Sequence, residues 1–204
     1  MRTTYDTTRR HILDAGQQLI VVKGFAGVGL NEILTAAAIP KGSFYHYFGS
    51  KEQYGCALMD QYFSDYLLRL DQLLHPFPDP ASDSPSARAR LITYWERWVD
   101  TQCGQDVKEK CLVVKLSAEV ADLSEDMRLI LCEGTKQVRV RLAACIADGV
   151  TDGSLQSGID PEKTAQMLYQ MWLGASLLAK LQRDRAPLEN AFATTITTLR
   201  EPVS

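Results

Sequence analysis

The sequence predicts an all-α protein, with an N-terminal three-helix helix-turn-helix domain followed by a larger C-terminal helical domain. Apolar residues recur every three or four positions along nearly the whole chain. No segment alternates convincingly between apolar and polar residues as a strand does. Capping residues, prolines and glycines divide the pattern into separate helices. With 204 residues, the chain is long enough to bury a sizeable core.

The apolar pattern of the N-terminal region predicts two helices. The first covers residues 7–22 and ends at Lys23 and Gly24. Its apolar positions follow helical spacing: Ile12, Leu13, Ala15, Leu19, Ile20 and Val22. The second is shorter and covers residues 30–38, and its inner face consists of Ile33, Leu34 and Ala37. Pro40 follows, and the residue before a proline avoids the helical region, so the second helix must end there.

The segment IPKGSFYHYFGSKEQY, residues 39–54, is the most informative part of the chain. Phe44 and Phe48 are four positions apart, so a helix places them on one face. Lysine, serine, histidine and tyrosine occupy the other faces, which suits a helix pressed into a nucleic-acid groove. An amphipathic helix that packs on a core is the alternative, and the segment alone leaves both open. Ser50 and Gln53 then form a capping box that opens a long helix ending near Leu74.

A segment with four prolines, residues 75–86, is expected to be an exposed linker or loop. Further helices are predicted over residues 87–103, 110–121, 124–150, 160–182 and 187–199. Two of these helices have clear start signals. Glu125 and Asp126 place acids in a first turn, and Asp160 is a capping residue before a proline at the first helical position.

Charge is distributed unevenly along the chain. The whole chain has a formal charge of −3, which excludes a general polyanion binder. Residues 1–50 contain five Lys/Arg and three acids, which gives +2 and leaves −5 for the remainder. This distribution is typical of a DNA-binding head joined to a separate acidic domain.

Composition and motifs exclude several other classes of protein. The five cysteines form no C-x-x-C pair and no metal-ligand spacing with the three histidines, so we expect no disulfide framework, metal or cofactor. The N-terminus lacks the apolar stretch of a signal peptide, and the longest apolar run, residues 167–181, is too short to span a bilayer. We therefore expect a cytoplasmic protein without membrane contact. Nothing resembles a hydrolase triad, paired catalytic acids or a nucleotide-binding loop, so we expect no enzymatic activity.

Residues 8–54 resemble the N-terminal domain of the tetracycline-repressor (TetR) family of bacterial one-component regulators. The matching motifs are Gly24-Phe25, Glu32-Ile33, PKGSFYHYF at residues 40–48 and Ser50-Lys51-Glu52. The resemblance implies a DNA-binding repressor that binds palindromic double-stranded operators as a homodimer. Residues 1–50 would form the DNA-binding domain and residues 51–204 the effector-sensing and dimerisation domain. In the family the last two long helices, here residues 160–182 and 187–199, pair with their copies.

The resemblance also implies DNA contacts for seven residues. Lys41, Gly42, Ser43 and His46 would lie nearest the base edges, and Tyr45, Tyr47 and Lys51 would hold phosphates. The chemistry of these residue types agrees, because lysine donates to guanine acceptors and glycine permits close backbone approach. Tyrosine hydroxyls and lysine bind phosphate oxygens. For Tyr47, burial under the following helix is the alternative.

Two positions depart from the family's pattern. The second helix usually starts on Ser or Thr, whereas this chain has Gly29 there and gives up a possible phosphate-binding hydroxyl. The turn before the recognition helix usually has glycine where this chain has Ala38. If that position is left-handed, alanine costs about 1 kcal/mol relative to glycine.

The C-terminal half resembles the N-ethylmaleimide-reductase repressor (NemR-like) group of the family. The matching segments are CLVVKLSAEVADLSEDMR at residues 111–128, WLGASLLAKLQR at residues 172–183 and PLENA at residues 187–191. Members of this group respond to electrophiles and oxidants through a cysteine. A related group with the same recognition helix responds to acrylate, so the recognition helix does not identify the inducer.

Cys111 is the candidate sensor. It stands at the start of a predicted helix, with Lys108 and Lys110 before it and Lys115 one turn later, and these groups would stabilise the reactive thiolate. A buried core cysteine is the alternative. The other four cysteines are expected to be ordinary core residues: Cys56, Cys103, Cys132 and Cys145. If a second thiol reacts, Cys103 is the best candidate among them.

Lys180 ends an otherwise apolar run and would need a partner if it were buried. It either extends outward with Arg183 and Arg185, or it faces the pocket and hydrogen-bonds a modified Cys111. Five further residues are candidate pocket lining, although such residues at helical spacing are more often core. They are Trp95, Trp98, Tyr169, Met171 and Trp172.

These observations leave three functions open. The first is a transcriptional repressor released from its operator by reactive electrophiles or oxidants that act on a cysteine. The second is a repressor released by reversible binding of a small acid or a hydrophobic drug. The third is a helical thiol enzyme, against which the absence of a resolving cysteine pair counts.

Overall fold

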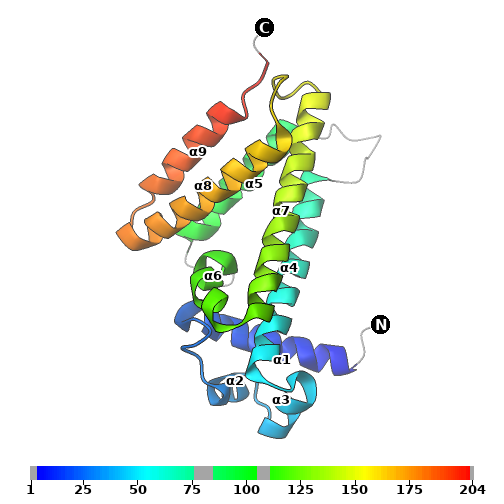
Figure 1. Cartoon of the computed structure of the whole chain (residues 1–204), viewed down its shortest axis with the longest axis vertical. Coiled ribbons are helices and arrows are strands. Elements are labelled where there is room, and N and C mark those ends of the chain that lie inside the picture. Colours follow the sequence, from blue (N-terminus) through cyan, green and yellow to red (C-terminus); the bar gives the residue numbers. More distant parts are fainter. Residues whose placement is uncertain (1–3, 76–84, 105–110, 203–204) are drawn as a thin grey trace. The chain divides into compact units, whose positions relative to one another are not determined.

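The computed structural model describes residues 4–75, 85–104 and 111–202. Within them it contains nine helices and no strand, so the predicted all-α fold is confirmed (Figure 1). In chain order the helices are α1 (Thr4–Lys23), α2 (Leu30–Ala36), α3 (Lys41–Phe48), α4 (Lys51–Leu74), α5 (Ala87–Cys103), α6 (Leu112–Leu123), α7 (Glu125–Thr151), α8 (Pro161–Gln182) and α9 (Ala186–Thr198).

The chain divides into two compact units. The first unit comprises Met1–Ser64 and Gln105–Gly134, and the second comprises Asp65–Gly104 and Thr135–Ser204. The first unit thus contains α1, α2, α3 and α6 with the N-terminal parts of α4 and α7. The second contains α5, α8 and α9 with the remainder of α4 and α7.

The core of the first unit forms where α1, α2 and α3 meet the start of α4. Fully buried side chains from each of these helices fill it, among them Ile12, Ile33, Phe44 and Tyr54. The Tyr54 hydroxyl donates to the backbone carbonyl of Ile12 at 3.2 Å. Gly16 leaves room for that hydroxyl, because a Cβ there would lie 1.9 Å from the Tyr54 oxygen.

The turns between the first helices follow the predicted signals. Gly24 takes a left-handed φ of 84° after α1, and Pro40 is the N-cap of α3. Ala38 has a φ of 51°, so the left-handed alanine expected in this turn is present. The Ser50 hydroxyl accepts from the Gln53 amide at 3.0 Å, as the capping box requires. The Ser50 amide, however, donates to the Phe48 carbonyl at 2.7 Å, so it takes a backbone partner in place of the Gln53 side chain.

The second unit is organised around α8 and α9, which run side by side (Figure 1). Aromatic side chains from α5 and α8 form its core. The indole rings of Trp95 and Trp172 are stacked with centroids 4.9 Å apart. The indole N–H of Trp98 donates to the Ser176 hydroxyl at 2.9 Å, and that of Trp172 donates to the Thr195 hydroxyl at 2.9 Å, which ties α9 to α8.

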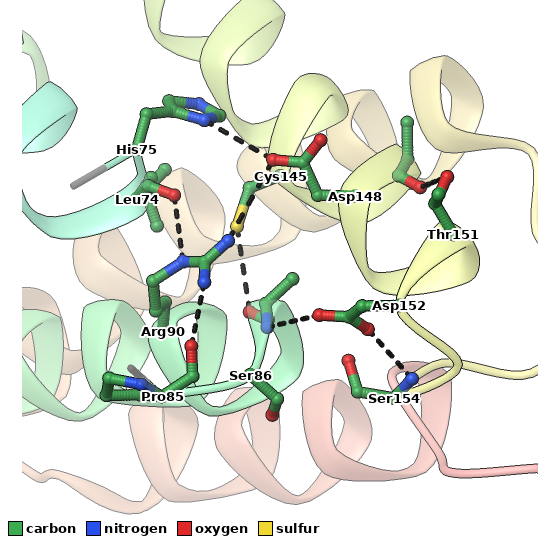
Figure 2. A network of polar contacts seen from close by, with 12 residues as sticks. Leu74, His75, Pro85, Ser86, Arg90, Cys145, Asp148, Thr151, Asp152 and Ser154 are labelled. Carbon is green, nitrogen blue, oxygen red and sulfur yellow. Dashed lines mark hydrogen bonds and ion pairs between the residues drawn. The ribbon is translucent and has the colours of Figure 1, made fainter. Parts of the chain in front are cut away.

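Arg90 of α5 is the centre of a polar network in the second unit (Figure 2). Its guanidinium donates to the carbonyls of Leu74 at 2.9 Å and Pro85 at 2.7 Å, and it lies 3.8 Å from Asp148. Leu74 and Pro85 lie on either side of residues 76–84, which belong to the predicted linker and fall outside the described residues. Arg90 therefore holds together the two described ends of this segment.

Side chains rather than a single N-cap residue satisfy the free amides at the start of α5. The Ser86 hydroxyl accepts from the Ala89 amide at 3.2 Å, and the Asp152 carboxylate accepts from the Ala87 amide at 3.0 Å. The Ser154 hydroxyl accepts from Arg88 at 3.2 Å. These contacts explain why α5 begins at the predicted residue, since every one of its first three amides has an acceptor.

The helix boundaries differ from the predicted ones by a few residues. Among the larger differences, α1 begins at Thr4 rather than residue 7, and α2 ends at Ala36 rather than residue 38. Helix α6 runs over Leu112–Leu123 rather than residues 110–121, because Cys111 has an extended backbone and acts as its N-cap.

Candidate functional site

The exposed face of α3 is the candidate DNA-binding surface. Phe44 and Phe48 are buried, so the predicted apolar anchor of this helix is confirmed. Lys41, Gly42, Tyr45 and His46 are exposed, and Ser43 and Tyr47 are half-buried. A helix with this division offers one continuous polar surface while its aromatic face holds it in the core.

Gly42 is the most open position on this surface. A Cβ placed there meets no described atom within 4 Å. No close contact inside the protein therefore requires glycine at this position, which agrees with a role in close approach to another molecule. Lys41 lies next to it, with its ammonium 5.9 Å from the centre of the Tyr45 ring.

Three rings from two helices gather beside this surface. The ring of Tyr5, on α1, lies 4.7 Å from the ring of Tyr47 and 5.9 Å from that of His46. Tyr47 is therefore packed against α1 while staying half-buried. Because Tyr5 is itself 44% exposed, the N-terminal end of α1 adjoins the surface that α3 presents. Sequence reasoning missed Tyr5, because its ring partners are some forty positions away in the chain.

Lys51 makes an internal contact at the start of α4. Its ammonium donates to the Phe25 carbonyl at 2.9 Å and lies 4.7 Å from the centre of the Phe25 ring. The side chain is half-buried. A lysine held in this way can still offer its other N–H groups, so its predicted phosphate contact stays a prediction.

Cys111 lies at the N-cap of α6 and faces Tyr62 of α4. The Tyr62 hydroxyl donates to the Cys111 sulfur at 3.8 Å and accepts from the Leu112 amide at 3.3 Å. Burial raises the pKa of the Cys111 thiol, whereas the Val114 amide, the Tyr62 hydroxyl and the Val113 amide act to lower it. Burial is the larger effect, so the thiol is held protonated more firmly than a free cysteine.

The structure gives Lys115 a different partner from the expected thiolate, whereas the contributions expected of Lys108 and Lys110 stay predictions. The ammonium of Lys115 donates to the Val22 carbonyl at 3.0 Å. Lys108 and Lys110 lie outside the described residues. The helix N-terminus does supply amides that favour the thiolate, but the low polarity around the sulfur outweighs them and raises the pKa.

The remaining cysteines occupy three different environments. Cys145 is fully buried, and burial raises its pKa to about 11. Cys56 is half-buried, and burial again raises its pKa. Cys132 and Cys103 are exposed, so the core interpretation is wrong for both, and Cys132 lies 3.5 Å from the Arg128 guanidinium. The exposure of Cys103 agrees with its place as the best candidate for a second reacting thiol.

Four of the five predicted pocket-lining residues are core residues of the second unit. The four aromatic residues are at least nine-tenths buried and contact one another through their rings: Trp95, Trp98, Tyr169 and Trp172. Met171 is half-buried. One polar atom among them is unusual. The indole N–H of Trp95 is buried and has no hydrogen-bond acceptor among the described residues.

Lys180 is exposed on α8, as the outward alternative for this side chain predicts. It belongs to the second unit and Cys111 to the first, and their pairing stays a prediction.

Glu119 of α6 was not singled out from the sequence. Its carboxylate accepts the amide hydrogens of Phe25, at 3.1 Å, and Ala26. These partners are 94 and 93 positions away in the chain, so no local pattern indicates them. Tyr62 was missed for the same reason, because its partner Cys111 is 49 positions away.

Comparison with known proteins finds the same family over most of the chain. Residues 12–53 match the family described as "Bacterial regulatory proteins, tetR family", and residues 87–195 match "Tetracyclin repressor-like, C-terminal domain". The HTH-type transcriptional repressor NemR of Escherichia coli (strain K12) is 42% identical over 190 residues, covering 93% of this chain and 92% of the relative. The HTH-type transcriptional repressor DhaR of Mycobacterium sp. (strain GP1) is 33% identical, covering 89% and 86%.

Solved structures agree with this result. The crystal structure of E. coli NemR in its reduced form matches with a TM-score of 0.88 and 40% identity, covering 97% of this chain and all of that one. Among the described residues, none of the helices has the length and apolar character needed to cross a membrane.

Proposed function

The chain belongs to the TetR family of bacterial transcriptional regulators, and from this premise we propose that modification of Cys111 by electrophiles or oxidants releases it from its operator. As a member of this family it is a DNA-binding transcriptional repressor and not an enzyme. The proposal therefore concerns which residues contact DNA, which helices form the dimer and what releases the protein from its operator. The placement of the Cys111 sulfur at the N-cap of α6, in hydrogen-bond contact with Tyr62 of α4, is the observation that carries it.

We propose that α3 enters the major groove and that its seven predicted residues divide the contacts. Lys41, Gly42, Ser43 and His46 lie nearest the base edges. The open space around Gly42 and the exposure of Lys41 and His46 support this assignment. Phosphate contacts fall to three residues with hydroxyl or ammonium groups: Tyr45, Tyr47 and Lys51.

The proposed DNA-binding surface divides the chain into two functional domains. Residues 1–50 act as the DNA-binding domain, and residues 51–204 act as the effector-sensing and dimerisation domain. Exposed apolar side chains on α8 support dimerisation through α8 and α9, because single exposed residues are common but a row on one helix is not. Met167, Leu177, Leu178 and Leu181 are 45–70% exposed. Gly174 lies among them with open space where a Cβ would stand, which permits close approach of a second helix.

The environment of Cys111 makes its reactivity conditional. A protonated thiol is a poor nucleophile, so the raised pKa slows its reaction with weak electrophiles. Two amides and the Tyr62 hydroxyl stabilise the thiolate once it forms, since they act to lower the pKa. We expect a thiol of this kind to react faster with strong electrophiles and oxidants than with weak ones.

Reversible binding of a small acid or hydrophobic drug is the second candidate trigger, and one observation favours it. The Trp95 indole N–H is a buried donor without an acceptor among the described residues, inside a cluster of aromatic rings. A ligand with an acceptor oxygen and a flat apolar body would satisfy that donor. In this alternative Lys180 has no part in thiol chemistry.

The two triggers are separated by replacing the thiol. We expect Cys111→Ser to bind an operator fragment selected from a random DNA pool as the parent does, but to stay bound when a quinone or hypochlorite is added. Cys132→Ser is the matched control, because this thiol is exposed and has no proposed part in sensing. This variant should leave DNA as the parent does. Normal release of Cys111→Ser would overturn covalent sensing through Cys111.

A companion variant tests the part of Lys180. If its ammonium acts on modified Cys111, Lys180→Ala should bind the same fragment normally and resist release by oxidant. Arg183→Ala is the control, because Arg183 is also exposed near the end of α8. Release unchanged from the parent would remove Lys180 from the mechanism.

A further inference from the structure

Helix α6 carries two charged side chains in line with its N-cap cysteine. Lys115 and Glu119 follow Cys111 at intervals of four, a spacing that places residues above one another on one side of a helix. Both charged groups contact backbone atoms at the end of α1 and in the turn that follows it. Lys115 donates to the Val22 carbonyl, and Glu119 accepts from the amides of Phe25 and Ala26.

These contacts satisfy backbone groups that the helices themselves leave free. The Val22 carbonyl is among the last four of α1 and has no acceptor role inside that helix. The Phe25 and Ala26 amides lie in the turn after Gly24. Gly24 takes a left-handed φ of 84°, which favours glycine, and a Cβ on it would lie 2.7 Å from the Glu119 carboxylate, so glycine leaves this carboxylate room to reach the turn.

The same turn is held from the direction of the recognition helix. The Phe25 carbonyl accepts from the ammonium of Lys51, which is three residues after the end of α3. Both backbone polar groups of Phe25 are therefore bound by charged side chains, its N–H by Glu119 of α6 and its carbonyl by Lys51 of α4. Hydrogen bonds with one charged partner are stronger than neutral ones, so the turn links α6 to the α3–α4 junction.

The other end of α6 is anchored at the thiol. The Tyr62 hydroxyl bonds both the Cys111 sulfur and the Leu112 amide, so a group added to the sulfur must displace this hydroxyl or move the first turn of α6. With maleimide as the electrophile, a bond forms between sulfur and one alkene carbon, and the thiol proton ends on the adjacent carbon. The thiol loses its hydrogen and gains bulk in a partly buried site.

We propose that Glu119 and Lys115 form a clamp on the α1–α2 turn, and that modification of Cys111 weakens DNA binding by shifting α6 and loosening this clamp. The second half rests on the proposed function. The clamp itself does not, because its contacts exist in the unmodified chain. Glu119 and Lys115 are positioning residues: they hold the turn that Lys51 connects to α3.

Glu119→Gln tests the clamp by removing the charge while keeping the shape of the side chain. Amide hydrogen exchange at Phe25 and Ala26 should accelerate about tenfold, as loss of a charge-assisted hydrogen bond implies. Affinity for the selected operator fragment should fall several-fold. Lys115→Met should give a smaller change in the same direction. Asp122→Asn is the matched control, because Asp122 is an exposed acid on the same helix.

Maleimide then tests the link to the thiol, with alkylation of Cys111 followed by mass spectrometry. In the parent, alkylation should accelerate exchange at Phe25 and Ala26. In Glu119→Gln, Cys111 should be alkylated as fast as in the parent, but exchange and DNA affinity should change little further. If Glu119→Gln behaves like Asp122→Asn before any reagent is added, the clamp is wrong. If the parent's Cys111 is alkylated without loss of DNA binding, the proposed function fails, whereas the clamp is judged by the unmodified variants alone.

Discussion

The hydroxyl of Tyr62 lies 3.8 Å from the sulfur of Cys111 and joins α4 to the N-cap of α6. One hydroxyl serves two partners here, since it donates to the sulfur and accepts from the Leu112 amide. The chemical state of the thiol is therefore tied to the position of the first turn of α6. Because only two residues separate the end of α3 from the start of α4, this hydroxyl lies on the helix that directly follows the proposed DNA-binding surface.

The raised pKa of Cys111 predicts a shifted pH profile for its alkylation. Only the thiolate attacks, so the rate should rise with pH and approach its plateau above the ordinary cysteine pKa of 9.0. Tyr62→Phe removes a hydrogen bond that lowers the pKa, so its profile should move further toward high pH. The measurement is the maleimide rate against pH in a chain with Cys103 and Cys132 replaced by serine. A midpoint at or below that of a free cysteine would contradict the burial argument.

Gly42→Ala should separate DNA binding from folding. The new methyl group meets no described atom within 4 Å, and alanine favours a helix over glycine by about 0.5–1 kcal/mol. The variant should therefore unfold at the same or a higher temperature than the parent. Affinity for the operator fragment should fall about tenfold or more if the backbone approaches DNA at this position. Unchanged affinity would place Gly42 outside the interface.

Ala38→Gly should stabilise the protein by about 1 kcal/mol, because Ala38 has a left-handed φ of 51° that glycine adopts without strain. Its matched control is Ala36→Gly, at an exposed residue in the last turn of α2, which should be neutral or destabilising. Urea unfolding of both variants provides the comparison. A loss of stability in Ala38→Gly would mean that the greater freedom of glycine in the unfolded chain outweighs the relief of strain.

Charges placed on the exposed row of α8 should disrupt the dimer. We expect Leu177→Glu together with Leu181→Glu to give a monomer by sedimentation, with much weaker operator binding, because both side chains are exposed in the single chain and must be buried in the pair. Leu129→Glu on α7 is the control, since Leu129 is 49% exposed and outside the proposed interface. A dimer that survives the double substitution would place the interface elsewhere.

The sequence was sufficient for the helices and for the surface of α3. Apolar spacing alone indicated that Phe44 and Phe48 share a buried face, and Pro40 and Ser50 marked the limits of the helix between them. Helix α5 begins and ends at the predicted residues. These features depend on residues within a few positions of one another, where helical geometry leaves little choice.

Sequence reasoning was least successful for the polar side chains of the first unit. Lys115 was expected to support a thiolate at Cys111, but it binds the carbonyl of Val22, 93 positions away. Cys132 was expected to be buried because its neighbours are apolar, yet it lies on the exposed side of α7. A long flexible side chain has many partners within reach, and only the packed structure decides which of them it meets.

The sequence by itself determined that this chain is a helical DNA-binding regulator with a cysteine at the start of a helix. Its local pattern specifies the helices, and its motifs specify the family. Only the tertiary structure decided the state of that cysteine, because burial by distant parts of the chain raises the pKa of the Cys111 thiol more strongly than the helix amides lower it. The same packing brings Glu119 to the Phe25 amide across 94 positions, a contact that long-range folding alone creates.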